Sequence, residues 1–291
     1  LKPFWLKSGQ VRGMAAARLR RLSSQLCAAS TTEGQSSEGS AQSSATVSVL
    51  AALESRKSAR AFLRQRPVPR ATVEDILRAA SRSPSDNNIQ QWKVYVVAGR
   101  LRDELCAEAL AERAKLAAAG QTPSSARLPP QADGSRPLRS PSRYPERFAA
   151  RSKANGRQYY GHIGILGDRV RGAAQQAKNY DFFGAPVGLF FYTELNYLNS
   201  WRDCGMFIQS VMLAARAYGL HTIAQGAWVH FDPVVRKYTG APEGETLLCG
   251  LGLGYEDTAA LENSLHTPRV SLDEMARFAG FEDEGVEDPL K

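Results

Sequence analysis

Residues 200–219 read SWRDCGMFIQSVMLAARAYG and predict the strongest helix in the chain. Ser200 is expected as its N-cap, Asp203 in its first turn, and Gly219 as the residue that ends it. A helix that is apolar on all sides must be buried on all sides. We therefore expect a central core helix, or one that packs against a second subunit. Its apolar side chains cover nearly every face: Trp201, Met206, Phe207, Ile208, Val211, Met212, Leu213, Ala214, Ala215 and Tyr218.

Four stretches around this helix predict strands. WKVYVVAG (92–99) is rich in β-branched and aromatic residues, and APVGLFFYTE (185–194) is almost wholly apolar. LHTIAQGAW (220–228) predicts a short strand and a turn, and TLLCGLGLGYE (246–256) predicts a further strand. The glycines at 250–254 lie within that strand, so we expect close packing there rather than a dinucleotide-binding loop. The fold class is α+β, with a mixed central sheet flanked by helices.

Further helices are expected on either side of these strands, at 47–55, 69–84, 100–119, 271–281 and in two pieces across 147–180. Thr72 is predicted as the N-cap of the second of these, with Asp75 completing a capping-box-like pair. Ser271 and Glu274 predict a second capping box.

The composition is that of an ordinary globular protein. The chain has 291 residues, of which 43% are hydrophobic and 23% charged, and no apolar run approaches the ~18 residues of a membrane-spanning helix. The net charge is +8, and residues 1–46 carry six basic and two acidic residues, so half of it lies there. The remaining +4 is mild, and it argues against the non-enzymatic alternative of a basic scaffold that binds nucleic acid.

No spacing in the sequence predicts a metal site. The cysteines and histidines fit neither a zinc pattern nor a CxxC redox motif. We interpret Cys106, Cys204 and Cys249 as buried or half-buried small apolar side chains in a reducing compartment.

Residues 1–46 predict an N-terminal extension outside the folded domain at 47–291. No acidic residue occurs from Leu1 to Thr32, and arginine, serine, alanine and leucine dominate. This composition is typical of a transit peptide, with the mitochondrion as the first destination; the alternative is a disordered tail of a cytoplasmic protein. A Pro/Ser/Arg-rich excursion at about 120–160 predicts a variable binding loop.

Four short stretches could bind a ligand, although each has an ordinary explanation. ESRKSAR (54–60) is either a solvated basic turn or an anion site, and spacing alone favours the turn. SPSDNNIQQW (83–92) is either a polar turn or a loop that reads the edge of a planar heterocycle. QGAW (225–228) is a small-residue turn after a strand, and HTPRVSLDE (266–274) places Arg269 just before a helix start.

Taken in order, these stretches resemble the nitroreductase superfamily of FMN-dependent oxidoreductases. RKSAR resembles the Arg-x-Ser-x-Arg/Lys element that opens this family, and SPSDNNIQQW resembles its Pro-Ser-x-x-Asn-x-Gln-Pro-Trp loop; the likeness runs from about Leu50 to Phe281. The resemblance implies an intertwined homodimer with FMN at the interface. It also implies a ping-pong reaction in which NADH or NADPH reduces nitroaromatic compounds or quinones.

The resemblance also implies roles for individual residues. Arg56 and Arg269 would face the FMN phosphate, and Arg60 would lie near the pyrimidine edge of the flavin ring. Gly226 would offer its backbone N–H to flavin N5. No side chain is expected to be catalytic, because the flavin carries the chemistry. The full set of expected cofactor contacts, some of them from the neighbouring subunit, is Arg56, Lys57, Ser58, Arg60, Pro84, Ser85, Asn88, Gln90, Gln225, Gly226, Ala227 and Arg269.

Some residues depart from the family pattern or lie in its variable part. Gln91 stands where the family has proline, which predicts a less rigid loop. Asp86 would either repel an anionic substrate or face solvent. Tyr144, Tyr159 and Tyr160 are candidate walls of a substrate pocket, with packing into the core as the alternative. Reductive dehalogenation and flavin fragmentation are alternative reactions of the superfamily, and each needs a specialised lid that the sequence does not reveal.

Overall fold

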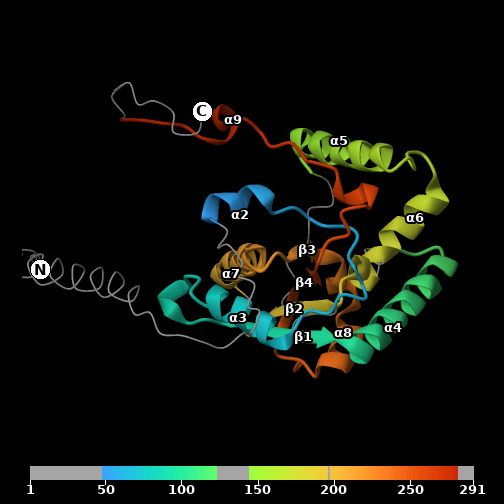
Figure 1. The fold of residues 1–291 in the computed structure, drawn as a ribbon, viewed down its shortest axis with the longest axis horizontal. Coiled ribbons are helices and arrows are strands. Elements are labelled where there is room, and N and C mark those ends of the chain that lie inside the picture. Colours follow the sequence, from blue (N-terminus) through green and yellow to red (C-terminus); the bar gives the residue numbers. More distant parts are fainter. Residues whose placement is uncertain (1–47, 123–143, 196, 281–291) are drawn as a thin grey trace, which may run out of the picture. The chain divides into compact units, whose positions relative to one another are not determined.

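The computed structural model describes residues 48–122, 144–195 and 197–280. The predicted transit peptide and residues 123–143 of the predicted excursion lie outside this part. Each predicted strand is present, and the four form one sheet: β1 Trp92–Ala98, β2 Val187–Thr193, β3 His221–Gln225 and β4 Thr246–Gly254 (Figure 1).

The strand order is β1-β2-β4-β3, and every neighbouring pair is antiparallel. The predicted α+β class is therefore confirmed, but the sheet is not mixed in the way we expected. Among the described residues, parallel pairing is limited to an isolated bridge between Ser58 and Thr222. A strand buried on both faces is typical of parallel sheets, and β2 is buried throughout. Here helices cover both faces of an antiparallel sheet, so the apolar pattern alone could not reveal strand direction.

Helices and single turns connect the strands. Short 3₁₀ segments of three to seven residues are η2 Asp86–Asn88, η4 Lys178–Gly184, η5 Gly226–Phe231 and η6 Leu261–Asn263. The α-helices are α2 Val49–Ser55, α3 Arg70–Ala80, α4 Gly99–Ala118, α5 Glu146–His162, α6 Arg169–Ala177, α7 Leu198–Ala217, α8 Asp232–Thr239 and α9 Leu272–Met275 (Figure 1).

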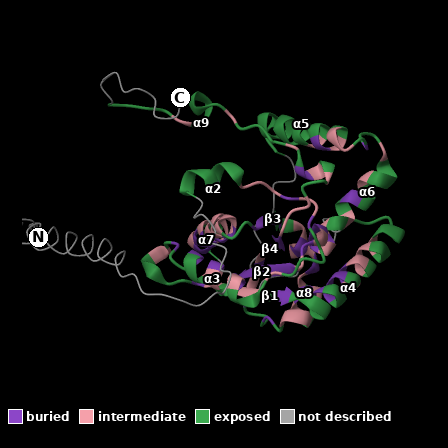
Figure 2. Ribbon diagram, viewed as in Figure 1, coloured by how far each residue is buried: buried purple, intermediate pink, exposed green. Residues whose placement is uncertain are grey.

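The sheet separates two hydrophobic cores because successive side chains of a strand point to opposite faces. Leu189 and Phe191 of β2 join the core formed with α3 and α7, whereas Phe190 and Tyr192 join the core formed with α4, α8, η4 and η5. Burial is concentrated along the sheet and on the helix faces that pack against it, while α5 and α9 are largely exposed (Figure 2).

Helix α7 buries only one side within a single chain. The side chains that pack on the sheet belong to Cys204, Phe207, Val211 and Ala215. On the opposite side Gly205 is exposed, and Met206 and Leu213 are only half-buried. The expected burial on all sides is therefore incomplete in one chain, which leaves an apolar strip on this helix for another partner.

Two predicted helix starts are wrong. Thr72 is not an N-cap, because α3 already begins at Arg70 after Pro69, whose fixed φ suits a helix start. Ser200 is the third helical residue of α7, and its hydroxyl accepts a hydrogen bond from the Tyr197 amide at 3.3 Å. Ser271 does precede α9, but its side chain makes no capping hydrogen bond to this four-residue helix.

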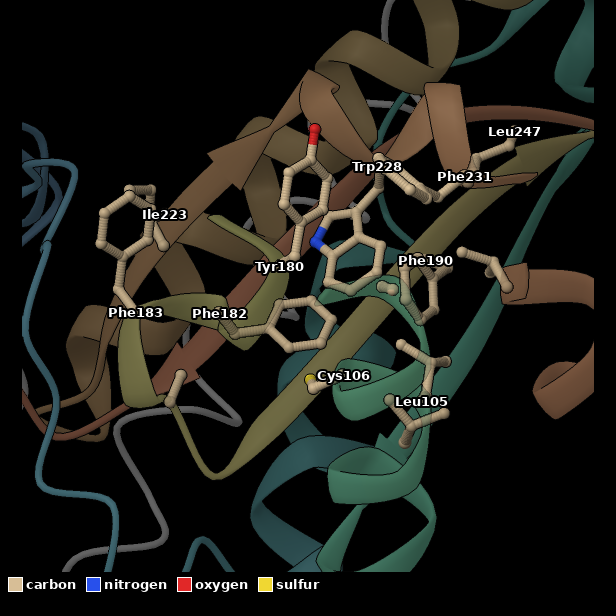
Figure 3. Close-up of a cluster of buried hydrophobic side chains, with 14 of the residues drawn as sticks. Leu105, Cys106, Tyr180, Phe182, Phe183, Phe190, Ile223, Trp228, Phe231 and Leu247 are labelled. Atoms are coloured by element: carbon tan, nitrogen blue, oxygen red, sulfur yellow. The ribbon is translucent and has the colours of Figure 1, made fainter. Parts of the chain in front are cut away.

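The glycines of β2 and β4 allow aromatic rings to lie directly on the sheet. A Cβ atom added at Gly250 would overlap the indole of Trp228, and one added at Gly188 would overlap the ring of Phe182. These two rings stack with their centroids 4.8 Å apart, next to Phe190 (Figure 3). Close packing is therefore the role of this glycine pattern, as the sequence predicted.

We expect Gly250→Ala to destabilise the protein by about 1–3 kcal/mol, because the methyl group must displace a fully buried indole. Urea unfolding followed by far-ultraviolet circular dichroism measures the change. Gly172→Ala on α6 is the matched control: no atom lies within 4 Å of its Cβ position, so it should leave stability unchanged or raise it by up to about 1 kcal/mol. Equal stabilities for Gly250→Ala and wild type would contradict this account of the sheet.

Candidate functional site

The RKSAR stretch is an extended segment clamped between two parts of the sheet. Ala59 donates its amide to the Thr222 carbonyl of β3 at 3.1 Å, next to the Ser58–Thr222 bridge. Four residues on, Leu63 donates to the carbonyl of Tyr255, directly after β4, at 2.9 Å. These backbone bonds fix the direction of the side chains: Ala59 is buried, whereas Ser58 and Arg60 are half-buried beside a groove.

The groove has a volume of about 1220 Å³, and we call it the RKSAR groove. Its walls come from the end of α2, the RKSAR stretch, helix α5, residue Gln209 of α7 and the segment from Leu265 to Glu274. The predicted site residues that line it are Arg56, Lys57, Ser58, Arg60 and Arg269. The two stretches that carry them are more than 200 residues apart in sequence, and the fold brings them together.

Two of the five basic side chains in the groove are neutralised by carboxylates. Lys57 Nζ lies 2.9 Å from Glu256 Oε2 and donates to the Asn263 carbonyl at 2.7 Å. Arg151 of α5 forms an ion pair with Glu274 of α9. The main role of Lys57 is therefore structural, because its charge is paired within the protein, although the residue also lines the groove.

The other three basic side chains, those of Arg56, Arg60 and Arg269, have no carboxylate partner among the described residues. Arg56 is half-buried and makes no side-chain hydrogen bond there. Arg269 donates only to neutral oxygens of Thr267 and Pro268. Arg56 and Arg60 are half-buried, and Arg269 is exposed. Because guanidinium groups without a carboxylate are well suited to a phosphate, this arrangement favours an anionic ligand.

Asn263 holds the RKSAR stretch in place, and no sequence pattern pointed to it. Its side chain is 3% exposed; its Oδ1 accepts the Arg60 amide at 2.7 Å, and its Nδ2 donates to the carbonyls of Ala61 and Asp257 at 2.8 Å each. Every polar atom of the amide is thus used. The bonds join segments about 200 residues apart, so only the fold could identify this residue.

A buried charged cluster supports the same stretch from beneath. Glu256, the partner of Lys57, also lies 3.0 Å from the Nε2 atom of His221. Burial lowers the pKa of His221 to about 4, and the neighbouring Arg216 acts in the same direction, so the imidazole is neutral at physiological pH. Arg216 also donates to the hydroxyl of Ser55 at 3.1 Å, which ties α7 to the residue that precedes Arg56.

The second predicted stretch, at 83–92, does not line the RKSAR groove. Its residues Pro84, Ser85, Asn88 and Gln90 lie in and around η2, which packs against the start of α7. Asn88 and Gln90 adopt positive φ angles of 59° and 50°, as does Asn87 at 47°. Such conformations cost free energy and are enriched at ligand-binding loops.

Asp203 of α7 anchors this loop. It is fully buried, lies one turn further into the helix than predicted, and its Oδ2 accepts the Asp86 amide at 2.8 Å and Gln91 Nε2 at 3.0 Å. Burial would raise the pKa of Asp203, but these bonds and that from Arg202 outweigh it and hold the pKa below its usual value. The Gln91 amide ties the loop to α7 through its bond to Asp203, a contact that proline could not make.

Asp86 adds a second tether. Its Oδ2 accepts Asn199 Nδ2 at 2.9 Å and lies 3.5 Å from the hydroxyl of Tyr197, both at the start of α7. The carboxylate is therefore half-buried against α7 rather than turned to open solvent, and it does not line the RKSAR groove of its own chain. Repulsion of an anionic substrate by Asp86 stays a prediction.

The third predicted stretch, Gln225–Ala227, lies where β3 ends and η5 begins. The Gln225 side chain is buried and donates to the Asn179 carbonyl at 2.6 Å, and Ala227 is half-buried. Gly226 is exposed, and no heavy atom lies within 4 Å of its Cβ position. A flat ligand could therefore approach the backbone at this glycine closely.

The three tyrosines proposed as pocket walls do not line the RKSAR groove. Tyr144 is 46% exposed, Tyr160 is half-buried, and Tyr159 is only 8% exposed. Tyr159 packs inward, with the Arg60 guanidinium 4.5 Å from its ring centroid, so core packing is the better description for this residue. The predicted excursion still contributes to the groove, through Arg151, Ala154, Asn155 and Gln158 of α5.

The described residues contain no cluster of side chains that could hold a metal ion, and no helix among them meets the length and hydropathy of a membrane span. Cys106 and Cys204 are buried free thiols and Cys249 is half-buried, as predicted. Burial raises the pKa of Cys106 to about 12, so this thiol stays protonated.

We expect Asp203→Asn to destabilise the protein at pH 7 by about 1–3 kcal/mol, because one neutral oxygen replaces the charged acceptor of the Asp86 amide and Gln91, and the new NH2 group would face the Arg202 donors. The pKa of Asp203 is lower in the folded state, so its contribution is complete above the unfolded value of ~3.9 and is lost as the pH falls through the folded pKa. Urea unfolding between pH 7 and pH 3 measures the difference between wild type and variant.

This difference should shrink at the acidic end of the series. Asp75→Asn is the control, because its carboxylate pairs with Arg78 on the exposed face of α3; it should change stability by less than about 1 kcal/mol. A difference for Asp203→Asn that stays constant over the whole pH range would contradict the assigned role.

Comparison with known proteins places the chain in a family. The model of the nitroreductase family matches residues 53–255. The 4-nitrobenzoate reductase of Pseudomonas putida is 32% identical over 235 residues, which cover 80% of this chain and 96% of the relative. The 4-nitrobenzoate reductase of Nocardioides sp. (strain LMS-CY) is 34% identical over 237 residues, 80% of this chain and 91% of the relative.

Solved structures show the same fold. The FMN and NADPH-dependent nitroreductase NfnB from sphigopyxis sp. strain HMH is 33% identical with a TM-score of 0.70, and the alignment covers 80% of this chain and all of that one. The FMN-dependent nitroreductase NfnB from Mycobacterium smegmatis, solved in complex with NADPH, is 26% identical with a TM-score of 0.69, over 79% of this chain and 96% of that one. The chain described here belongs to the nitroreductase family.

Proposed function

We propose that this protein binds FMN in the RKSAR groove and uses NADH or NADPH to reduce nitroaromatic compounds, with quinones as further acceptors. The observation that carries the proposal is the set of three guanidinium groups without carboxylate partners in this groove, in a chain of the nitroreductase family. Relatives described as FMN and NADPH-dependent nitroreductases and as 4-nitrobenzoate reductases support the cofactor and the acceptor class.

The donor set of the groove fits FMN. Arg56 and Arg269 offer fork-shaped donors to a phosphate, and Ser58 adds a hydroxyl beside them. Arg60 is anchored through its backbone by Asn263, so its charge would lie at a fixed place along the flavin ring. We propose that this place is the pyrimidine edge, where a cation favours the negative charge added by reduction.

FMN, when bound, accepts a hydride from the nicotinamide and passes reducing equivalents to the acceptor, so the protein needs no nucleophile of its own. The residues of the chain bind the flavin and orient it. The open backbone at Gly226 leaves room for the N–H to reach a flat ring, and the buried Gln225–Asn179 bond fixes the turn that carries it. A site that accepts donor and acceptor in succession would give ping-pong kinetics.

We further propose that a second copy of the chain completes the site. The η2 loop, with Ser85, Asn88 and Gln90, is absent from the lining of the groove formed by its own chain. Large apolar side chains are exposed on several elements, as expected for an unoccupied protein interface. They are Val49, Leu50 and Leu53 on α2, Leu198 at the start of α7, and Leu272, Met275 and Phe278 near the C-terminus.

The first experiment is an absorbance spectrum of the purified protein with FMN, before and after anaerobic addition of NADH or NADPH. We expect visible flavin bands that bleach with at least one donor and return when 4-nitrobenzoate or a quinone is added. A halotyrosine acceptor tests the alternative of reductive dehalogenation. A protein that binds no FMN, or whose bound flavin no nicotinamide reduces, would overturn the proposal.

Arg56→Gln tests where the phosphate lies. Loss of a charge-assisted pair should weaken FMN binding by about 1.5–3 kcal/mol, while riboflavin, which lacks the phosphate, should bind the variant and the wild type alike. Arg78→Gln on α3 removes an arginine that pairs only with Asp75 and should change neither affinity. Isothermal titration gives both dissociation constants; parallel weakening of FMN and riboflavin would argue against Arg56 as a phosphate ligand.

The shared site predicts a dimer that retains FMN only when assembled. Light scattering should give twice the mass of one chain. Leu213→Glu on the half-buried strip of α7 should shift the protein toward a monomer that releases FMN, because a carboxylate would be buried in the interface. Leu101→Glu, on the exposed side of α4, is the matched control and should keep both dimer and flavin. A wild-type monomer with full FMN affinity would refute the shared site.

A further inference from the structure

Tyr159 lies directly against the guanidinium group of Arg60. The Cζ atom of Arg60 is 4.5 Å from the centroid of the tyrosine ring, within the range of a cation–π contact. Arg60 has no carboxylate partner among the described residues, and its side chain otherwise makes a long 3.4 Å hydrogen bond to the Ser58 carbonyl. The ring of Tyr159 is therefore the main contact that orients this charge.

The tyrosine itself is held firmly. It is 8% exposed, and its hydroxyl accepts a 2.6 Å hydrogen bond from Nε2 of Gln175, a buried residue of α6. Burial raises the pKa of Tyr159 to about 12, although Arg60 and Gln175 oppose the rise, so the phenol stays neutral. A neutral ring with one fixed orientation presents its negative face to the cation without forming an ion pair.

The backbone and the side chain of Arg60 are thus fixed from two different directions. Asn263 holds its amide at 2.7 Å, and Tyr159 of α5 covers its guanidinium. A cation held by a ring keeps its full charge available, whereas a carboxylate at the same place would cancel it. This arrangement suits an arginine whose charge acts on a ligand.

We infer that Tyr159 is a positioning residue, whose ring face holds the Arg60 guanidinium at the wall of the RKSAR groove and thereby sets the effect of Arg60 on the reduction potential of bound FMN. The inference rests on the proposed function, because it needs FMN in this groove. It assigns Tyr159 to the cofactor rather than to the wall of an acceptor pocket. A residue of the variable excursion would then tune the flavin.

The test is the midpoint potential and the dissociation constant of bound FMN in a set of variants. Tyr159→Leu removes the ring face and should shift the potential in the negative direction and weaken FMN binding about 2- to 10-fold. Tyr159→Phe keeps the ring and should restore the wild-type potential. Tyr238→Leu is the matched control, because its ring lies 5.3 Å from the Lys237 ammonium on α8, outside the RKSAR groove; it should leave both values unchanged.

A double-mutant cycle separates positioning from a general loss of packing. Arg60→Gln should lower the potential by itself, and Tyr159→Leu should add nothing in that background, since the ring acts through the arginine. Tyr159→Met serves as a second variant without the ring if the melting temperature of the Tyr159→Leu protein is too low for the measurement. Additive shifts, or a Tyr159→Leu protein with unchanged FMN potential but an altered KM for the acceptor, would overturn the inference.

The same set of measurements distinguishes the two proposals. A wild-type protein that binds no FMN overturns the proposed function, and this inference falls with it. If bound FMN bleaches with NADPH or NADH but its potential does not respond to Tyr159→Leu, the proposed function stands and only this inference is overturned.

Discussion

The structure of the site depends on one extended segment, residues 56–63, which is hydrogen-bonded along both of its edges. Backbone hydrogen bonds join Ala59 to β3 and Leu63 to the residue after β4, and the Asn263 amide closes the remaining gap. Because the backbone cannot rotate, alternate side chains must lie in the core and beside the groove. Arg56 and Arg60 thereby lie beside the groove without a carboxylate partner among the described residues, an arrangement that favours an anionic ligand.

The basic cluster alone could not decide between a solvated turn and an anion site, because that choice depends on partners far away in sequence. Lys57 shows the difficulty: it carries a positive charge as Arg56 does, yet it is paired with the carboxylate of Glu256. The two carboxylates that pair with basic side chains of the groove, Glu256 and Glu274, belong to stretches that no local pattern connects with residues 54–60. The resemblance of ordered motifs favoured an anion site where spacing alone favoured the turn, and Arg56, Lys57, Ser58, Arg60 and Arg269 do line one groove.

Much of the fold followed from local chemistry, and the misses have physical causes. All four strands were predicted, the first from β-branched and aromatic content and the second from its apolar run. Pairing direction is a tertiary property, so the antiparallel sheet was missed. Thr72 and Ser200 look like N-caps, yet α3 already begins after Pro69, and the Ser200 hydroxyl serves the Tyr197 amide inside a helix that begins at Leu198. Asn263 and Asp203 were missed as hubs because a buried hydrogen-bonding residue carries no sequence signature.

Helix α7 links the two halves of the proposed site. Its residue Asp203 and its first turn hold the η2 loop, its residue Gln209 lines the RKSAR groove, and Arg216 supports Ser55 at the other end. The strip with Met206 and Leu213 faces away from the sheet core of its own chain. If a second copy packs on this strip, the helix that forms the interface also presents the loop and the groove to each other across it. Assembly and cofactor binding would then stabilise one another by mass action, since FMN would bind the dimer and not the separated chains.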